Sequence, residues 1–70
     1  MSEINNCIRK LRFECGEMTQ QELADKVACT RQTINALEKG RYTPSLMLAF
    51  RLARVFGRKV EDVFSFDVEK

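Results

Sequence analysis

Short apolar runs at helical spacing make up most of the chain, separated by three glycines and a single proline. This pattern predicts a compact all-α domain of five short helices over about residues 5–15, 19–27, 30–39, 46–56 and 60–64. In the first of these, Ile8 and Leu11 share an apolar face, while Arg9, Lys10 and Arg12 lie largely on the other side.

Three of the predicted helices begin at residues suited to N-capping. Thr19 followed by Glu22 is typical of a capping box, and Thr30 and Ser45 precede the third and fourth helices. Between the second and third helices, Ala28 occupies the turn, where an alanine at positive φ would cost about 1 kcal/mol. These signals define a helix-turn-helix segment over about residues 19–39.

The fourth predicted helix is apolar around most of its circumference, which favours a place in the middle of the bundle. Its apolar members are Leu46, Leu48, Ala49, Phe50, Leu52, Ala53, Val55 and Phe56. The expected exposed stripe consists of Met47, Arg51, Arg54 and Arg58.

The two ends of the chain are predicted to pair. Residues 65–70 alternate polar and apolar side chains as a strand does, and a strand this short needs a partner. Residues 2–5 form the other non-helical segment of suitable length, so we expect a small antiparallel pairing of the termini.

The third predicted helix opens with a row of hydrogen-bonding side chains. Arg31, Gln32 and Asn35 lie on its exposed side, and Thr30 and Thr33 are beside them as a helix cap and a phosphate or methyl contact. Arginine matches O6 and N7 of guanine, and glutamine matches N6 and N7 of adenine. Sequence-specific DNA binding is therefore the leading hypothesis.

The net charge of +2 is unevenly distributed along the chain. Residues 1–29 carry a net charge of −1, residues 30–59 carry +6 and residues 60–70 carry −3. The basic middle block begins with the predicted recognition segment and would attract a polyanion. For Arg51, Arg54 and Arg58 of the exposed stripe, a solvated helix face is at least as good an interpretation as contact with DNA.

Length and composition disfavour several other classes. Residues 1–70 form one small domain with no room for a separate catalytic domain. Because the chain has no histidine and places Cys7, Cys15 and Cys29 in no CxxC pair, we expect no metal site, no cofactor and no enzyme activity. We expect a cytoplasmic location, with the three thiols reduced and acting as small, partly buried apolar residues; a thiol-based redox switch is the alternative. Cys29, just before a helix N-terminus, is the one whose thiolate is favoured. No secretory leader, membrane span or small-molecule ligand is expected.

Four spaced blocks of residues resemble the XRE-type helix-turn-helix regulators, relatives of phage lambda repressor and Cro. The blocks are TQQELA at 19–24, TRQTI at 30–34, LEKG at 37–40 and YTPSL at 42–46, and the resemblance extends from about Ile8 to Phe64. It implies a five-helix lambda-repressor-like DNA-binding domain whose third helix enters the major groove. The chain is most similar to stand-alone members without a ligand-binding domain, including dimers of the cytolysin-repressor type whose two ends form a small sheet.

The resemblance also implies roles residue by residue. Arg31, Gln32 and Asn35 match the family's base-contacting positions. Thr30 and Thr33 lie beside them. Positions that contact the DNA backbone are matched by Gln20, Lys39, Arg41 and Tyr42. For Tyr42, packing under the loop is an equally good interpretation. Two departures concern Ala28, where the family often has glycine, and Ala36, where some phage repressors carry a base-contacting polar residue.

One recognition helix reads few base pairs, so useful selectivity predicts a homodimer with its two helices about 34 Å apart on a near-palindromic operator. The expected dimerisation segment is the tail, about residues 60–70, with Val60, Val63, Phe64 and Phe66 at the interface unless they serve ordinary core packing. A repressor is favoured, because a chain this small has little spare surface for touching polymerase. The alternative is a protein-interaction module such as an antitoxin-like partner, for which acidic or apolar residues at the tip of the third helix would be expected.

Overall fold

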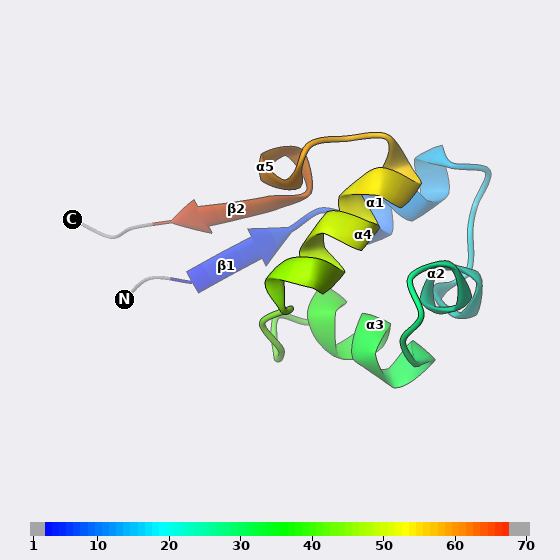
Figure 1. The fold of residues 1–70 in the computed structure, drawn as a ribbon, viewed down its shortest axis with the longest axis horizontal. Helices are drawn as coiled ribbons and strands as arrows, with labels where there is room; N and C mark the ends of the chain where they lie inside the picture. Colours follow the sequence, from blue (N-terminus) through cyan, green and yellow to red (C-terminus); the bar gives the residue numbers. More distant parts are fainter. Residues whose placement is uncertain (1–2, 68–70) are drawn as a thin grey trace.

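The computed structural model describes residues 3–67. Along the chain the elements are β1 (Glu3–Asn6), α1 (Ile8–Glu14), α2 (Gln20–Lys26), α3 (Arg31–Glu38), α4 (Leu46–Phe56), α5 (Val60–Val63) and β2 (Phe64–Asp67). The helices pack into one bundle, from which the paired strands project on one side (Figure 1). The predicted five-helix fold is confirmed, and none of the described helices is long and apolar enough to cross a lipid bilayer.

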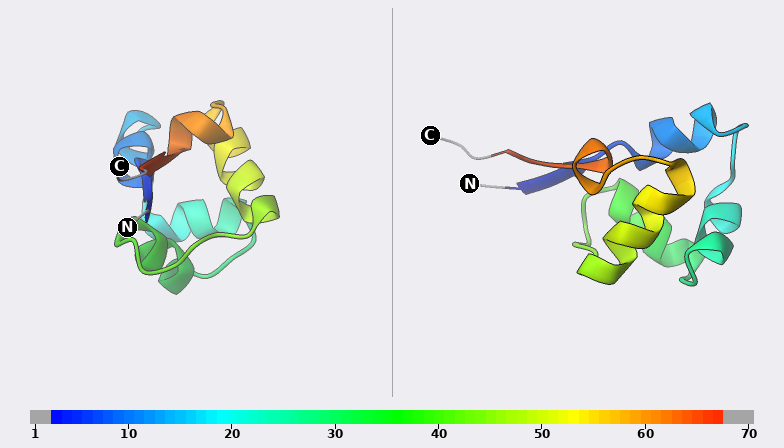
Figure 2. Two further views of the ribbon diagram at one scale, coloured as in Figure 1. Left: turned by 90° about the vertical axis from the view of Figure 1, so that its left-hand side faces the viewer. Right: turned by 45° about the horizontal axis from the view of Figure 1, so that its top comes forward.

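β1 and β2 form an antiparallel pair, as predicted for the two ends of the chain. The register places Ile4 opposite Phe66 and Asn6 opposite Phe64. The observed strands begin one residue away from the predicted starts, and residues 2 and 68–70 of the predicted pairing lie outside the described residues. Phe64 packs against the core, whereas Phe66 is 60% exposed where the strand pair extends beyond the helices (Figure 2).

Helix α1 begins at Ile8, so the prediction that it starts at residue 5 is wrong. Long-range hydrogen bonds hold the preceding residues in the strand. Asn6 Nδ2 donates to the Leu37 carbonyl at 2.8 Å, and the Cys7 amide donates to the Val63 carbonyl at 3.0 Å. Asn6 Oδ1 also accepts from the Ile8 amide at 3.2 Å and so satisfies a donor of the first helical turn.

The core is formed by one face of each helix. Its members are Ile8, Leu11, Leu23, Ala24, Val27, Ile34, Leu37, Leu48, Leu52, Ala53, Phe56 and Val63. Val63 is only 1% exposed, so its side chain is not available to a partner and its assignment to the interface is corrected. Helix α5 ends at this residue, one earlier than predicted, because β2 begins at Phe64.

Helix α4 is buried on one face only, although its sequence predicts a central helix. Leu46 is 71% exposed and Phe50 is 53% exposed, and they lie one turn apart beyond the edge of the buried face. Met47 is exposed as predicted, at 63%. The N-terminal half of α4 therefore presents three large apolar side chains on the surface.

The predicted helix caps are confirmed. Thr19 Oγ1 accepts from the Glu22 amide at 3.0 Å while Glu22 Oε1 accepts from the Thr19 amide at 2.8 Å, which is a complete capping box. Thr30 Oγ1 accepts from the Thr33 amide. Ser45 Oγ caps α4, which ends at Gly57 in the left-handed conformation.

Ala28 has φ of 59°, as its place in the turn predicts. Replacing it by glycine relieves about 1–2 kcal/mol of steric strain and costs about 0.5–1 kcal/mol in chain entropy. We therefore expect Ala28→Gly to raise the free energy of unfolding by about 0.5–1 kcal/mol in urea denaturation. The matched control is Ala36→Gly inside α3, which should lower it by about 1 kcal/mol. Equal destabilisation by both substitutions would contradict the assignment of strain to Ala28.

Candidate nucleic-acid interface

Helices α2 and α3 pack against each other across the tight turn and fix which side of α3 faces outward. The Cys29 amide donates to the Ala24 carbonyl at 3.0 Å within this turn. On α3, Ile34 is fully buried and Leu37 is 1% exposed. The inward direction of these two residues turns the first residues of α3 toward solvent.

Arg31 and Gln32 are exposed at the start of α3. Neither side chain makes a hydrogen bond or an ion pair with any of residues 3–67. Together with Asn35, Ala36 and Arg41 they line a shallow hollow in the surface. The structure thus brings three residues predicted to contact bases together with one predicted to contact the DNA backbone.

The two threonines beside them are engaged within the protein. Besides accepting from the Thr33 amide, the Thr30 hydroxyl lies 3.0 Å from the Thr33 hydroxyl, within hydrogen-bond distance. This pair caps α3, which agrees with the expectation that Thr30 and Thr33 are supporting residues rather than primary readers.

Arg12 is buried, contrary to the prediction that it lies on the outer side of α1. It is 7% exposed, and its guanidinium forms a two-pronged ion pair with Glu38, with Nε 2.7 Å from Oε2 and Nη2 3.1 Å from Oε1. Its Nη1 donates to the Met18 carbonyl at 2.8 Å. The pair ties α1 to the last turn of α3.

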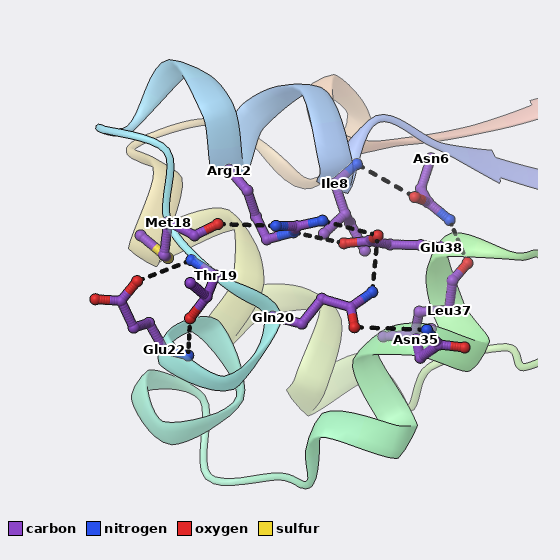
Figure 3. Close-up of polar contacts among 10 residues, drawn as sticks. All are labelled: Asn6, Ile8, Arg12, Met18, Thr19, Gln20, Glu22, Asn35, Leu37 and Glu38. Carbon is purple, nitrogen blue, oxygen red and sulfur yellow. Dashed lines mark hydrogen bonds and ion pairs between the residues drawn. The ribbon is translucent and has the colours of Figure 1, made fainter.

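Gln20 connects this ion pair to the exposed side of α3 (Figure 3). Its Nε2 donates to Glu38 Oε1 at 3.2 Å, and its Oε1 accepts from Asn35 Nδ2 at 3.5 Å. Gln20 and Asn35 are both half-buried. The side chain predicted to touch the DNA backbone therefore lies directly against one predicted to touch a base.

The other residues predicted to contact the DNA backbone follow α3. Lys39 and Arg41 are exposed, and Tyr42 is 47% exposed. Lys39 also lines a larger groove between α1 and α3, shared with Arg9 and Lys10. These two basic residues of α1 were not predicted as site residues, because their helical spacing indicates an outer face without saying what lies beside it.

The ion pair also determines the charge of this face. Glu38 is the one acidic residue within positions 30–59, and Arg12 from α1 pairs with it. The cations of α3 and the following loop, Arg31, Lys39 and Arg41, therefore have no carboxylate of their own segment left to pair with. Just after the end of α4, by contrast, the solvated interpretation fits Arg58, whose Nη2 lies 3.3 Å from Glu14 Oε1 in a half-exposed pair.

Two titratable groups near the helix-turn-helix depart from their ordinary pKa. Hydrogen bonds from the Thr19 amide and hydroxyl hold the pKa of the Glu22 carboxyl below its ordinary value. Burial raises the pKa of the Cys29 thiol, so the expectation that this thiolate is favoured is wrong. Cys15 is exposed rather than partly buried, which corrects a second expectation about the cysteines.

Within residues 3–67, no group of three or more Cys, Asp or Glu side chains could hold a metal ion.

The candidate interface residues of the tail differ in exposure. Val60 and Phe64 are partly buried against the core, and only Phe66 is largely exposed. Its strand partner Ile4, which was not predicted, is 39% exposed. The sequence around Ile4 contains no local signal that its side chain is exposed. Its position beside Phe66 is seen only in the pairing of the two strands.

Comparison with known proteins gives matches along nearly the whole chain. A helix-turn-helix family model matches residues 8–63. An uncharacterized HTH-type transcriptional regulator from Methanothermobacter thermautotrophicus is 61% identical over 61 residues, covering 86% of this chain and 87% of the relative. Another such regulator from Archaeoglobus fulgidus is 56% identical over 63 residues, covering 90% and 89%.

The likeness extends to bacteria and to a solved structure. The uncharacterized HTH-type transcriptional regulator YgzD of Bacillus subtilis is 42% identical over 66 residues, covering 94% of this chain and 98% of the relative. A crystal structure from Bacteroides fragilis, described as that of a "putative DNA-binding protein", superposes with a TM-score of 0.77 at 19% identity, covering 89% of this chain and 98% of that one. At this identity the likeness supports the fold alone.

Proposed function

The chain belongs to the XRE-type helix-turn-helix family of transcriptional regulators. On this premise we propose that it is a repressor that binds a near-palindromic operator. It binds as a homodimer, with α3 of each copy in the major groove. The observation that carries the proposal is that the side chains of Arg31 and Gln32 are available for contact with DNA. Both are exposed at the tip of α3 and make no polar contact with the described residues, while the neighbouring threonines serve as the cap.

Base readout is proposed for Arg31 and Gln32, with Asn35 as a third contact. The arginine fork matches guanine and the glutamine amide matches adenine, so the two side chains can specify neighbouring base pairs. Thr30 and Thr33, whose hydroxyls already bond to each other, are assigned supporting contacts to phosphate or to a thymine methyl.

Backbone contacts are proposed for Gln20, Lys39, Arg41 and Tyr42. The Gln20 amide nitrogen carries two hydrogens, and its bond to Glu38 uses one of them, so the second is available to a phosphate oxygen. Lys39 and Arg41 supply exposed positive charge next to the readout residues, which favours phosphate binding. These contacts orient α3 but carry no sequence information.

The homodimer is supported by apolar surface that the described residues do not cover. Ile4 and Phe66 lie side by side on a two-stranded pair, an arrangement of marginal stability alone in water. We propose that Phe66 lies at the dimer interface, with Val60 and Phe64 at its edge. A two-fold dimer presents two recognition helices and so predicts an operator of two inverted half-sites.

Selection of bound sequences from a random duplex library tests the function as a whole. The expected result is a near-palindromic consensus whose half-site centres lie about one helical turn, 10–10.5 base pairs, apart. The absence of any enriched sequence would contradict the proposal and would favour a protein-interaction module instead.

Arg41→Ala is expected to weaken binding to all duplexes alike, because a phosphate contact is independent of sequence. The plot of log affinity against log salt concentration should become shallower by about 1. Binding titrations of the parent and the variant at several salt concentrations, on selected and unrelated duplexes, measure both effects. Arg54→Ala, which removes an exposed charge from α4, is the control. An unchanged slope for Arg41→Ala would remove this residue from the backbone contacts.

A further inference from the structure

Four side chains form a continuous polar chain from the interior to the proposed DNA-facing surface. Arg12 pairs with Glu38, Glu38 accepts from Gln20, and Gln20 accepts from Asn35 (Figure 3). The interior end is fixed, since the side chains of Arg12 and Glu38 are each only 9% exposed. The exterior end is a residue proposed to contact a base.

The chemistry of Glu38 determines the direction of every bond in this chain. A carboxylate only accepts hydrogen bonds, so Gln20 must present its amide nitrogen to Glu38. The Gln20 carbonyl oxygen then faces Asn35, and because that oxygen also only accepts, Asn35 must present its own nitrogen to Gln20. The Asn35 Oδ1 is thereby directed away from Gln20, as Figure 3 shows.

The reversed arrangement is disfavoured at each link. Turning the Gln20 amide around would place its oxygen against a Glu38 oxygen, two acceptors with no hydrogen between them. Because the Glu38 side chain is nearly buried, water cannot easily supply the missing donor. An isolated asparagine on a helix surface could present either end of its amide, whereas Asn35 is restricted to one.

We infer that Glu38, acting through Gln20, makes Asn35 present a hydrogen-bond acceptor to the base edges. Among the base atoms of the major groove, donors are found on N6 of adenine and N4 of cytosine, whereas guanine and thymine offer acceptors at O6, N7 and O4. Asn35 Oδ1 therefore favours adenine or cytosine on the strand it contacts, and at adenine the Nδ2 hydrogen that is not bonded to Gln20 can also be donated to N7. Glu38 and Gln20 are positioning residues for this readout, which rests on the proposed function.

The test measures base preference at one position. The position read by Asn35 is identified first. It is the base pair of the selected operator whose substitution weakens binding of the parent but not of the Asn35→Ala variant. Dissociation constants of the parent are then measured on four duplexes that differ only there. We expect adenine and cytosine to bind about fivefold or more tightly than guanine and thymine.

Gln20→Met breaks the chain while keeping a side chain of similar length. The preference at the Asn35 position should fall to within about threefold, because the amide can then turn, while the preferences at the positions read by Arg31 and Gln32 remain. The matched control is Gln21→Met, on the same helix, whose partner is the exposed Asp25 at 2.9 Å. This control should keep the full preference at all positions.

The outcomes separate this inference from the proposed function. If the parent enriches no sequence, the function fails and the inference fails with it. If the parent enriches a sequence but prefers guanine or thymine at the Asn35 position, or if Asn35→Ala reveals no such position, the inference alone is wrong. It is also wrong if Gln20→Met weakens binding to all duplexes but keeps the preference, as loss of a phosphate contact alone would. It is equally wrong if Gln20→Met lowers the preferences at all positions alike, as a purely structural loss would.

Discussion

Arg31→Ala is expected to weaken binding to the selected duplex by about five- to 150-fold, the effect of losing one two-pronged base contact worth about 1–3 kcal/mol. The fold should be unaffected, because this exposed side chain makes no hydrogen bond or ion pair with residues 3–67. Competition titrations against duplexes carrying each base pair at the affected position measure the loss, and circular dichroism measures helicity.

The control for this prediction is Arg31→Lys, which keeps the charge but replaces the planar fork by a single ammonium group. Lysine should retain the affinity for unrelated duplexes and lose most of the discrimination between base pairs. Gln32→Ala should produce a similar loss at the neighbouring base pair. If Arg31→Ala and Gln32→Ala both bound the selected duplex as tightly as the parent, α3 would not be the reading element.

Local signals in the sequence predict the parts of the fold that depend on neighbouring residues. Thr19 and Glu22 form their capping box within one turn of helix, and the side chains of Thr30 and Ser45 each accept from the amide three residues later to cap the next two helices. Since a cap and the first turn it satisfies are at most three residues apart, the pattern contains all the information needed. The phase of α3 follows from these starts, which is why the outward direction of Arg31 and Gln32 was predictable.

Contacts between distant residues explain what the sequence did not predict. The start of α1 depends on Asn6 bonding to Leu37, 31 positions away. The burial of Arg12 depends on Glu38, 26 positions away, and helical spacing alone places an arginine outside. The exposure of Phe50 on α4 depends on which arc of that helix its neighbours cover, which apolar spacing cannot specify when most of the circumference is apolar.

The same reasoning applies within the candidate site. Arg31 and Gln32 are predicted as base-contacting residues from the local helix pattern and from the chemistry of their side chains. Their contact with bases is still a proposal. The link from Glu38 through Gln20 to Asn35 joins α2 and α3 through side chains, and no spacing rule indicates that three polar residues will meet. The sequence can therefore suggest which residues face the DNA but not which residues orient them.

Glu38→Leu is expected to produce the largest loss of stability of any substitution considered for this protein. It leaves the Arg12 guanidinium buried with only the Met18 carbonyl as a hydrogen-bond acceptor among the described residues. Removing one partner of a buried ion pair costs about 3–5 kcal/mol. A chain of 70 residues has a total stability of about 4–10 kcal/mol. Thermal unfolding followed by circular dichroism should show a midpoint lowered by more than about 15 °C.

The double variant Arg12→Met with Glu38→Leu separates the loss of the pair from the burial of an unpaired charge. With both charges replaced by apolar side chains of similar size, most of the lost stability should return, because such replacements of buried pairs are often neutral or stabilising. The recovery should be incomplete, since the Met18 carbonyl and the Gln20 amide each lose a partner worth about 1 kcal/mol. A double variant no more stable than Glu38→Leu would show that the pair itself holds α1 to α3.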